Sequence, residues 1–296
     1  MSETLFPEFL DNQVEASDAR YAAILGLSPS NGARSPALWN AAYALADTNA
    51  MMHPFDISKP RLAPLISALR SDDRYVGGAV AVPYKQALVP LLDRLEPEAE
   101  RIGAVNTIYR DGEDLLGANT DGLGALAQLK DVVDDLSSRS VLLIGLGGAG
   151  RAVAAYLVGN VSRLKLANRT LGTAHAFADR LGSEVETVDL PQSAADLRGV
   201  NLIVNCSSVG HQDGDQGSPL GEHSESLLET MPDDSVVYDI IYQPAETELL
   251  RHAKVIGLRT LNGRGMNLDQ AVIAFEKANP DLLSRDEIRA AMQSVG

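Results

Sequence analysis

The chain has 296 residues, of which 45% are hydrophobic and 22% charged, with a formal net charge of −15. This length and composition are typical of a water-soluble α/β protein with about two domains. The acidic balance argues against nucleic acid and anionic membrane surfaces as partners, because both attract Lys and Arg. No apolar run approaches the length of a membrane span, and no signal-peptide pattern is visible. With Cys206 as the single cysteine, we expect a cytoplasmic location.

Hydrophobic patterning predicts alternating strands and helices in the first half of the chain. Residues 1–20 are polar and weakly patterned, which suggests a short helix and a linker. Strands are predicted at 21–26, 51–57, 75–82, 105–109 and 114–118, with Asp111-Gly112 as the turn of a hairpin. Helices are predicted at 62–69 and 96–102. Two more are predicted to start at Ser35, as N-cap, and at Lys85.

The second half continues the alternation. After a helix at 121–133 and a polar linker, strands are predicted at 141–144, 164–167, 185–188, 201–205, 236–241 and 259–261. Helices are predicted at 151–157, 172–181, 247–256, 266–277 and 284–293. Strands that are apolar throughout and alternate with helices indicate parallel, doubly wound sheets covered on both faces.

A glycine-rich turn carries the clearest functional signal. A buried strand, Val141–Ile144, runs into a G-x-G-x-x-G pattern and then into helix-forming sequence, and the turn contains Gly145, Gly147, Gly148, Ala149 and Gly150. In this context the pattern is typical of a dinucleotide site, because the helix start offers free N–H groups and a positive dipole to a pyrophosphate. The alternative is a glycine-rich turn that binds no ligand.

The residues after the next predicted strand indicate which dinucleotide is bound. Asn168, Arg169 and Thr170 stand where an NAD site usually has Asp or Glu for the ribose 2′-OH. A guanidinium can instead hold a 2′-phosphate through bidentate, charge-assisted hydrogen bonds. An exposed turn arginine without a ligand is the alternative. The sequence therefore favours NADP(H), with NAD as the second choice.

Three polar clusters in the first half fall at predicted strand ends or turns, at Val82–Lys85, Gly103–Thr107 and Gly117–Gly122. Such positions line the ligand crevice of open α/β sheets. Lys85 at a helix start opposes the helix dipole, so it is a poor choice for stability alone. Asp121 stands where a loop meets a helix. We take both as candidate functional residues, the alternatives being a solvated lysine and a simple N-cap.

Together these motifs resemble those of the shikimate dehydrogenase family, in the same order along nearly the whole chain. The three first-half clusters are similar to the family motifs V-P-F-K, G-A-V-N-T and N-T-D-G. The glycine turn resembles G-x-G-G-A-[SGA]. Matches to N-R-T, N-x-T-S-x-G, D-x-x-Y-x-P-x-x-T and G-M-x-x-x-Q follow at residues 168–170, 205–210, 239–247 and 265–270.

The resemblance implies a two-domain fold, with an α/β substrate domain at 1–121, a doubly wound Rossmann NADP-binding domain at 122–262, and helices at 263–296 that return to the first domain. It also implies reversible, NAD(P)-dependent reduction of a 3-dehydroshikimate-like ketone to its alcohol. Lys85 and Asp121 become the catalytic pair. Substrate contacts are implied for Ser35, Asn106, Tyr242 and Gln270. Cofactor contacts are implied for the glycine turn, Asn168, Arg169, Thr170, Ser207, Gly265 and Met266.

The chain departs from the family where the substrate carboxylate is held. The family's Asn and Thr before V-P-F-K are Ala79 and Ala81 here, and its S-x-S-P motif is residues 33–36, beginning with Ala33. A carboxylate that loses these donors binds more weakly unless other groups replace them. Ser30 and Arg34 are candidate replacements, in a turn similar to that of the divergent shikimate dehydrogenase-like branch.

Two other functions remain open from the sequence. One is an NAD-dependent quinate/shikimate dehydrogenase or an aminoshikimate-type enzyme. The other is a dinucleotide-binding regulator without catalysis, against which the retained Lys85 and Asp121 argue. We expect a small-molecule substrate and no metal, since the five histidines lack ligand spacing. The oligomeric state stays open, with a homodimer as one possibility.

Overall fold

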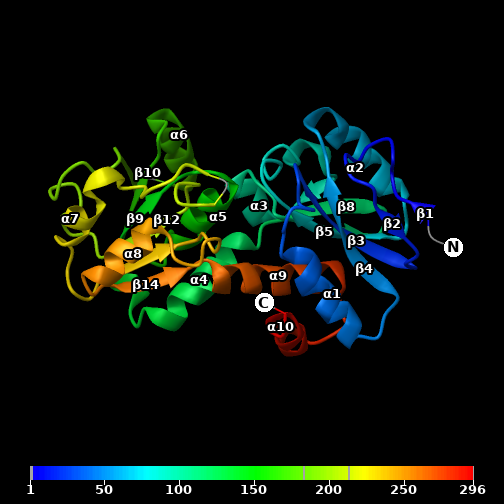
Figure 1. Cartoon of the computed structure of the whole chain (residues 1–296). Coiled ribbons are helices and arrows are strands. Elements are labelled where there is room, and N and C mark those ends of the chain that lie inside the picture. Colours follow the sequence, from blue (N-terminus) through cyan, green and yellow to red (C-terminus); the bar gives the residue numbers. More distant parts are fainter. Residues whose placement is uncertain (1–2, 183, 213, 296) are drawn as a thin grey trace. The chain divides into compact units, whose positions relative to one another are not determined.

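The computed structural model describes residues 3–182, 184–212 and 214–295. They form two compact units, the first made of residues 1–120 and 268–296 and the second of residues 121–267 (Figure 1). Each unit is built on a six-stranded sheet with helices. This confirms the predicted two-domain α/β class. Among the described residues, no helix is both long and apolar enough to cross a bilayer.

The sheet of the first unit has the strand order β4-β3-β5-β7-β8-β6. Its strands are β3 (Arg20–Gly26), β4 (Ala50–Asp56), β5 (Tyr75–Val80), β6 (Arg94–Leu95), β7 (Thr107–Asp111) and β8 (Asp114–Ala118). The first three run parallel, whereas β7 is antiparallel to both β5 and β8. The predicted hairpin is therefore present, and it makes this sheet mixed rather than parallel throughout.

Helices cover both faces of this sheet. They are α1 (Ser35–Leu45), α2 (Leu62–Ser71), α3 (Pro97–Ile102) and α10 (Arg285–Gln293), together with the part of α9 (Arg264–Ala278) that belongs to the unit. Alternate residues of β3 enter two separate cores, as the two-residue period of a strand requires. Tyr21 and Leu25 pack with α2, while Ala22 and Ile24 pack with α1, α9 and α10.

The second unit has a fully parallel sheet with the order β11-β10-β9-β12-β13-β14. Its strands are β9 (Ser140–Ile144), β10 (Arg163–Ala167), β11 (Val185–Val188), β12 (Leu202–Asn205), β13 (Val236–Asp239) and β14 (Arg259–Asn262). The helices are α4 (Asp121–Val132), α5 (Gly148–Leu157), α6 (Leu171–Leu181), α7 (Ser224–Leu228) and α8 (Glu248–Val255). This is the doubly wound order, whose direction reverses between β9 and β12.

The N-terminal segment differs from its prediction. In place of a helix it forms a small antiparallel pair, β1 (Glu3–Thr4) with β2 (Glu15–Ala16). The reason is tertiary, because Leu5, Leu10 and Val14 are buried in the core that α2 covers. Contacts of this kind are not visible in the local pattern of a mostly polar segment.

No helix starts at Lys85, which is also contrary to prediction. Residues 82–88 form successive turns that lead to a short 3₁₀ helix, Val89–Leu91. The carbonyl of Lys85 accepts a hydrogen bond from the Val105 N–H at 2.7 Å, so it is not available for a helical bond. Pro90 further disfavours helical geometry at the residue before it.

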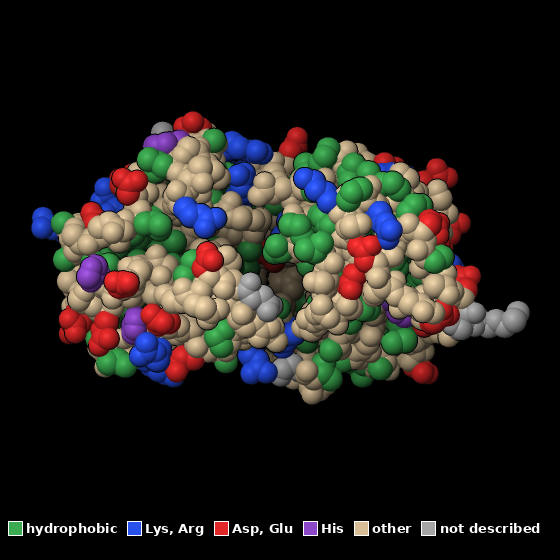
Figure 2. All heavy atoms as spheres, turned by 45° about the horizontal axis from the view of Figure 1, so that its top comes forward, with side chains coloured by type: hydrophobic (Ala, Val, Ile, Leu, Met, Phe, Trp, Pro, Cys, Tyr) green, Lys and Arg blue, Asp and Glu red, His purple; other side chains and the backbone are tan. Residues whose placement is uncertain are grey.

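Two boundaries also move. Strand β5 ends at Val80, two residues before the predicted end. Helix α1 takes Arg34 as its N-cap, so Ser35 lies inside the first turn and caps nothing. On the face of the molecule drawn in Figure 2, acidic and basic side chains are interspersed, so the net negative charge is not gathered into one patch there.

Candidate active site and cofactor site

Lys85 lies just beyond the carboxyl end of β5 and is half-buried. Its backbone hydrogen bond to Val105 places it beside the segment that carries Asn106. Ala81, four residues earlier, donates its N–H to the carbonyl of Leu25 at 2.8 Å, at the end of β3. The turn that carries the lysine is therefore held to the edge of the sheet where β3 and β5 end.

Asn106 and Gln270, two predicted substrate residues, are brought together. Both are buried, and Asn106 Nδ2 donates to Gln270 Oε1 at 3.1 Å and to Thr120 Oγ1 at 2.9 Å. Asn106 Oδ1 in turn accepts the Thr120 N–H at 2.8 Å. Thr120 Oγ1 is also 2.9 Å from the carbonyl of Gln270. This network fixes the orientation of both amides, because each amide has a defined donor and acceptor end.

The start of α1 presents two further predicted residues. Arg34 is half-buried at the N-cap position. Ser35 is buried, with 7% of its surface exposed, and its side chain makes no hydrogen bond to any residue the structure describes. Its oxygen is not among the fully enclosed side-chain atoms that lack a partner, so the hydroxyl reaches the surface. Ser35 therefore has its donor and acceptor capacity left for a ligand.

Ser30 is placed differently. Its N–H and its hydroxyl both donate to the carboxylate of Asp56, at 2.9 Å and 2.5 Å. A serine hydroxyl has only one hydrogen to donate. In this arrangement Ser30 cannot also donate to a substrate carboxylate, and the negative charge of Asp56 lies beside it.

Ala33, Ala79 and Ala81, which replace polar family residues, belong to one apolar cluster with Trp39 and Ala271. Ala81 packs tightly against the end of β3, because a Cβ atom added to Gly26 would lie 3.0 Å from the Cβ atom of Ala81. Each of the three positions therefore contributes a methyl group to this cluster in place of the polar side chain of the family motifs.

The second unit carries Asp121 as the first residue of α4, with only 4% of its surface exposed. Gly122, the next residue, allows α4 to pack closely on α5. A Cβ at this position would lie 2.2 Å from the ring of Tyr156 and 2.5 Å from the carbonyl oxygen of Ala152. The glycine of the N-T-D-G motif thus has a packing reason.

The glycines of the turn between β9 and α5 serve different purposes. Gly145 has φ of +94°, and a Cβ there would lie 2.6 Å from the N–H nitrogen of Ser207. A Cβ on Gly150 would lie 2.0 Å from the carbonyl oxygen of Gly145. Gly147, the N-cap of α5, has an ordinary φ of −69° and nothing within 4 Å of its Cβ position. Packing does not require a glycine at 147, whereas a pyrophosphate close to the backbone would.

The loop after β10 lies beside this turn. Asn168 Oδ1 accepts the Leu146 N–H at 3.1 Å, and its Nδ2 donates to the carbonyl of Thr170 at 3.0 Å. Arg169 projects from the same loop with 89% of its side chain exposed. Its Nη1 is 3.8 Å from a carboxylate oxygen of Asp215, which is itself 72% exposed. Asn168 therefore orders the loop, and Arg169 is accessible to a 2′-phosphate.

A buried polar network closes the carboxyl ends of β12 and β13. Asp239 accepts hydrogen bonds from Asn205 Nδ2, the Ile241 N–H and Thr247 Oγ1, at 3.1, 3.1 and 2.8 Å. Asn205 Oδ1 also accepts from the N–H and hydroxyl of Ser207. Burial raises the pKa of Asp239 to about 6, against the lowering effect of its hydrogen bonds. The network shapes the segments that carry Ser207 and Tyr242.

The sequence and fold of the chain are similar to those of known proteins in a way that agrees with this geometry. The family described as the shikimate dehydrogenase substrate binding domain matches residues 28–108, and the shikimate/quinate 5-dehydrogenase family matches residues 127–213. The NADP(+) shikimate dehydrogenase of Bacillus licheniformis is 38% identical over 82% of this chain and 85% of its own length. The chain belongs to the shikimate dehydrogenase family.

Solved structures of the family have the same fold. Shikimate 5-dehydrogenase from Thermus thermophilus, in complex with NADP(H) and shikimate, has a TM-score of 0.78 and 30% identity, covering 94% of this chain and 100% of its own. Quinate dehydrogenase from Corynebacterium glutamicum, in complex with NAD, has a TM-score of 0.81 and 28% identity with the same coverage.

One positioning residue of this family member was missed from the sequence. Gln128 on α4 accepts hydrogen bonds from the Met266 N–H and the Tyr238 hydroxyl and donates to the carbonyl of Asn262. Its side chain also occupies the space where Gly265 lacks a Cβ. Gln128 follows Asp121 by two helical turns, so the two share a helix face. That spacing is the signal that could have found it.

Proposed function

We propose that this chain is an NADP-preferring dehydrogenase that interconverts shikimate, or a close alicyclic hydroxy-acid, and its 3-dehydro ketone. The observation that carries the proposal is Lys85 at the strand-end edge that also holds the Asn106–Gln270 pair. Family membership, with NADP(+)-dependent relatives, supports the same activity.

The residues have separate roles in this proposal. Oxidation of a carbinol releases a hydride and the hydroxyl proton. NADP⁺ held by the second unit would supply the hydride acceptor. Lys85 takes or returns the proton, or polarises the oxygen, since an amine within reach of the hydroxyl can act as a general base. Asp121 orients the lysine and accepts a substrate hydroxyl. Asn106 and Gln270 bind ring hydroxyls, with the substrate replacing one of the two hydrogen bonds that Asn106 Nδ2 makes to Gln270 and Thr120. Tyr242 contributes a further substrate contact.

The two units divide the binding work in the same proposal. The first unit, with the C-terminal helices, supplies most of the substrate contacts, and the second binds NADP and adds Asp121 and Tyr242. Gly145, Gly147, Gly148, Ala149 and Gly150 receive the pyrophosphate. Asn168, Arg169 and Thr170 hold the adenosine 2′-phosphate, and Ser207, Gly265 and Met266 line the rest of the cofactor site. The open Cβ position of Gly147 and the exposed Arg169 support this assignment.

Arg34 takes the place of the missing carboxylate donors, beside Ser35, the hydroxyl that the chain retains from the family motif. Arg34 supplies a charged fork, and Ser35 supplies a hydroxyl with no described partner. Ser30 belongs to the same turn, but its hydrogen bonds to Asp56 direct it to shaping the turn. We therefore assign Ser30 no direct contact with the substrate carboxylate.

We also propose a cytoplasmic enzyme, for which a lone cysteine and a biosynthetic family argue. A homodimer remains part of the proposal, to be tested by the mass in solution. The second candidate activity is NAD-dependent quinate oxidation. It is favoured by the loss of polar groups at Ala79 and Ala81 and by the similarity to quinate dehydrogenase.

A substrate and cofactor panel tests the proposal. Shikimate and quinate are each assayed with NADP⁺ and with NAD⁺, and kcat/KM is compared over the four pairs. The proposal predicts the highest value for shikimate with NADP⁺. A highest value for quinate with NAD⁺ selects the second candidate, and no turnover of any pair in a folded, NADP-binding protein supports the regulator.

A further inference from the structure

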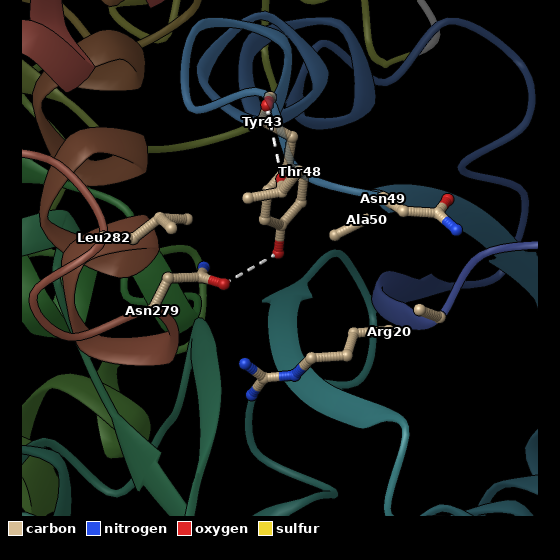
Figure 3. Close-up of a pocket in the computed structure, with 8 residues that line it drawn as sticks. Arg20, Tyr43, Thr48, Asn49, Ala50, Asn279 and Leu282 are labelled. Carbon is tan, nitrogen blue, oxygen red and sulfur yellow. Dashed lines mark hydrogen bonds between the residues drawn. The ribbon is translucent and has the colours of Figure 1, made fainter.

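A cavity of about 240 Å³ lies in the first unit where β3 and β4 begin (Figure 3). Arg20 and Ala50, the first residues of these strands, line it. The candidate substrate residues follow the opposite, carboxyl ends of β3 and β5. Strand β3 has seven residues, and at about 3.3 Å per residue its two ends are roughly 20 Å apart. The cavity is therefore separate from the candidate active site.

The wall of the cavity combines buried polar groups with apolar surface. Tyr43 of α1 donates its hydroxyl hydrogen to Asn279 Oδ1 at 3.1 Å, and the exposed fractions of the two residues are only 2% and 8%. Asn279 Nδ2 donates one of its two hydrogens to the carbonyl of Phe275. Leu282, Ala50 and the Tyr43 ring supply the apolar part. Figure 3 shows the polar ends of Arg20, Tyr43 and Asn279 on one side of the cavity.

Arg20, an exposed residue at the start of β3, brings a positive charge to this wall. The chain has 40 acidic and 25 basic residues, yet the Arg20 side chain forms no ion pair or hydrogen bond with any residue in the described ranges. Burial raises the pKa of Tyr43, while Asn279 and Arg20 lower it. Tyr43 therefore stays neutral at physiological pH. The cavity wall thus presents one full positive charge and neutral polar groups.

We propose that this cavity binds a small organic carboxylate whose body is about one six-membered ring. The guanidinium fork matches a carboxylate in a bidentate manner. An apolar cavity of about 150 Å³ accommodates benzene, so the larger volume here admits a ring with its carboxylate. A doubly charged phosphate would need more positive charge than the single Arg20 guanidinium of this wall supplies.

Methyl NMR of protein with ¹³C-labelled alanine tests the proposal with benzoate as the probe. Ala19 and Ala50 line the cavity, whereas Ala79 and Ala81 report on the candidate substrate surface. Benzoate should shift the Ala19 and Ala50 signals saturably. Benzamide, which has the same shape without the charge, should bind at least about tenfold more weakly.

Two variants and a control locate the ligand. Arg20→Gln should raise the Kd for benzoate at least about tenfold. Ala50→Leu lacks the Ala50 signal and is read at Ala19, whose shift it should abolish by filling the cavity. Arg198→Gln removes an exposed arginine of the second unit and should change nothing. The proposal is overturned by any of three results: no saturable shift up to about 50 mM benzoate, equal binding of benzamide, or unchanged affinity in Arg20→Gln. Shifts confined to Ala79 and Ala81 would overturn it as well.

Discussion

Arg34 carries the substrate carboxylate in the proposed enzyme, because positions 33, 79 and 81, where the family motifs have polar side chains, hold alanine here. Arg34→Gln should raise KM for shikimate by roughly 10- to 100-fold, the value of a hydrogen bond to a charged group, with a smaller effect on kcat. Ser30→Ala is the matched control. Its hydroxyl hydrogen goes to Asp56, so KM should change far less. Steady-state kinetics would contradict the assignment if the two variants had equal effects.

Arg169 is expected to select the cofactor. Arg169→Gln should weaken NADP⁺ binding by about 1.5–3 kcal/mol and leave NAD⁺ binding nearly unchanged, because only NADP⁺ has the 2′-phosphate. Direct titration of both cofactors measures the two dissociation constants. Equal losses for NADP⁺ and NAD⁺ would mean that Arg169 only shapes its loop.

Asp239 should make stability depend on pH. Its folded-state pKa of about 6 lies above the ordinary value of 3.8, so the folded protein binds more protons than the unfolded chain between these values. The stabilising contribution is full below pH 3.8 and is lost as the pH rises through 6. Asp239→Asn removes this titration. Between about pH 4 and about pH 7, the unfolding free energy of the variant minus that of the wild type should rise by at most about 3 kcal/mol. Denaturant titrations that show a constant difference would refute the link.

At the scale of elements, the turn between β9 and α5 contains one glycine that ligand binding requires and others that packing requires. Gly147→Ala meets no atom within 4 Å and should leave the unfolding free energy nearly unchanged while weakening NADP⁺ binding. Gly150→Ala, the control, would collide with the Gly145 carbonyl and should destabilise the protein. Denaturant unfolding and cofactor titration on both variants give the comparison. Unaltered NADP⁺ affinity in Gly147→Ala would contradict the assignment of the pyrophosphate site to Gly147.

The sequence predicted the elements whose signal is local. Strand β9, its glycine turn and α5 are in place, as are α4, α6 and the β7–β8 hairpin, because apolar runs, glycines and the Asp-Gly turn specify them directly. The helix expected at Lys85 was wrong because a distant N–H, that of Val105, uses the carbonyl that a helix needs. The N-terminal pair β1–β2 likewise depends on a core contributed by other segments.

The candidate site shows the same division. The motifs brought Asn106 and Gln270 into view, and they are hydrogen-bonded although 164 residues apart. The Ser30–Asp56 contact could not be predicted, since it joins a turn to the end of a neighbouring strand whose register only the folded sheet fixes. Residue type indicated the chemistry, whereas partner choice required the structure.

At the scale of the whole molecule, the chain passes from the first unit to the second between Thr120 and Asp121 and returns between Asn267 and Leu268. The proposed proton-transfer residues Lys85 and Asp121 therefore belong to different units. So do Met266 and Gln270, which share helix α9. Because Arg34 and Lys85 belong to the first unit and Arg169 to the second, substitutions at these residues should disable substrate turnover and NADP⁺ binding separately.

The most direct measurement of the central claim compares catalysis with cofactor binding in a single variant, Lys85→Ala. Its kcat for shikimate oxidation should fall by about 100-fold or more, as expected for a lost general acid–base group. Its dissociation constant for NADP⁺ should stay within about twofold of wild type, because the proposed cofactor residues lie in the other unit. A variant that binds NADP⁺ normally and turns over shikimate at the wild-type rate would contradict the assignment of Lys85 and the mechanism built on it.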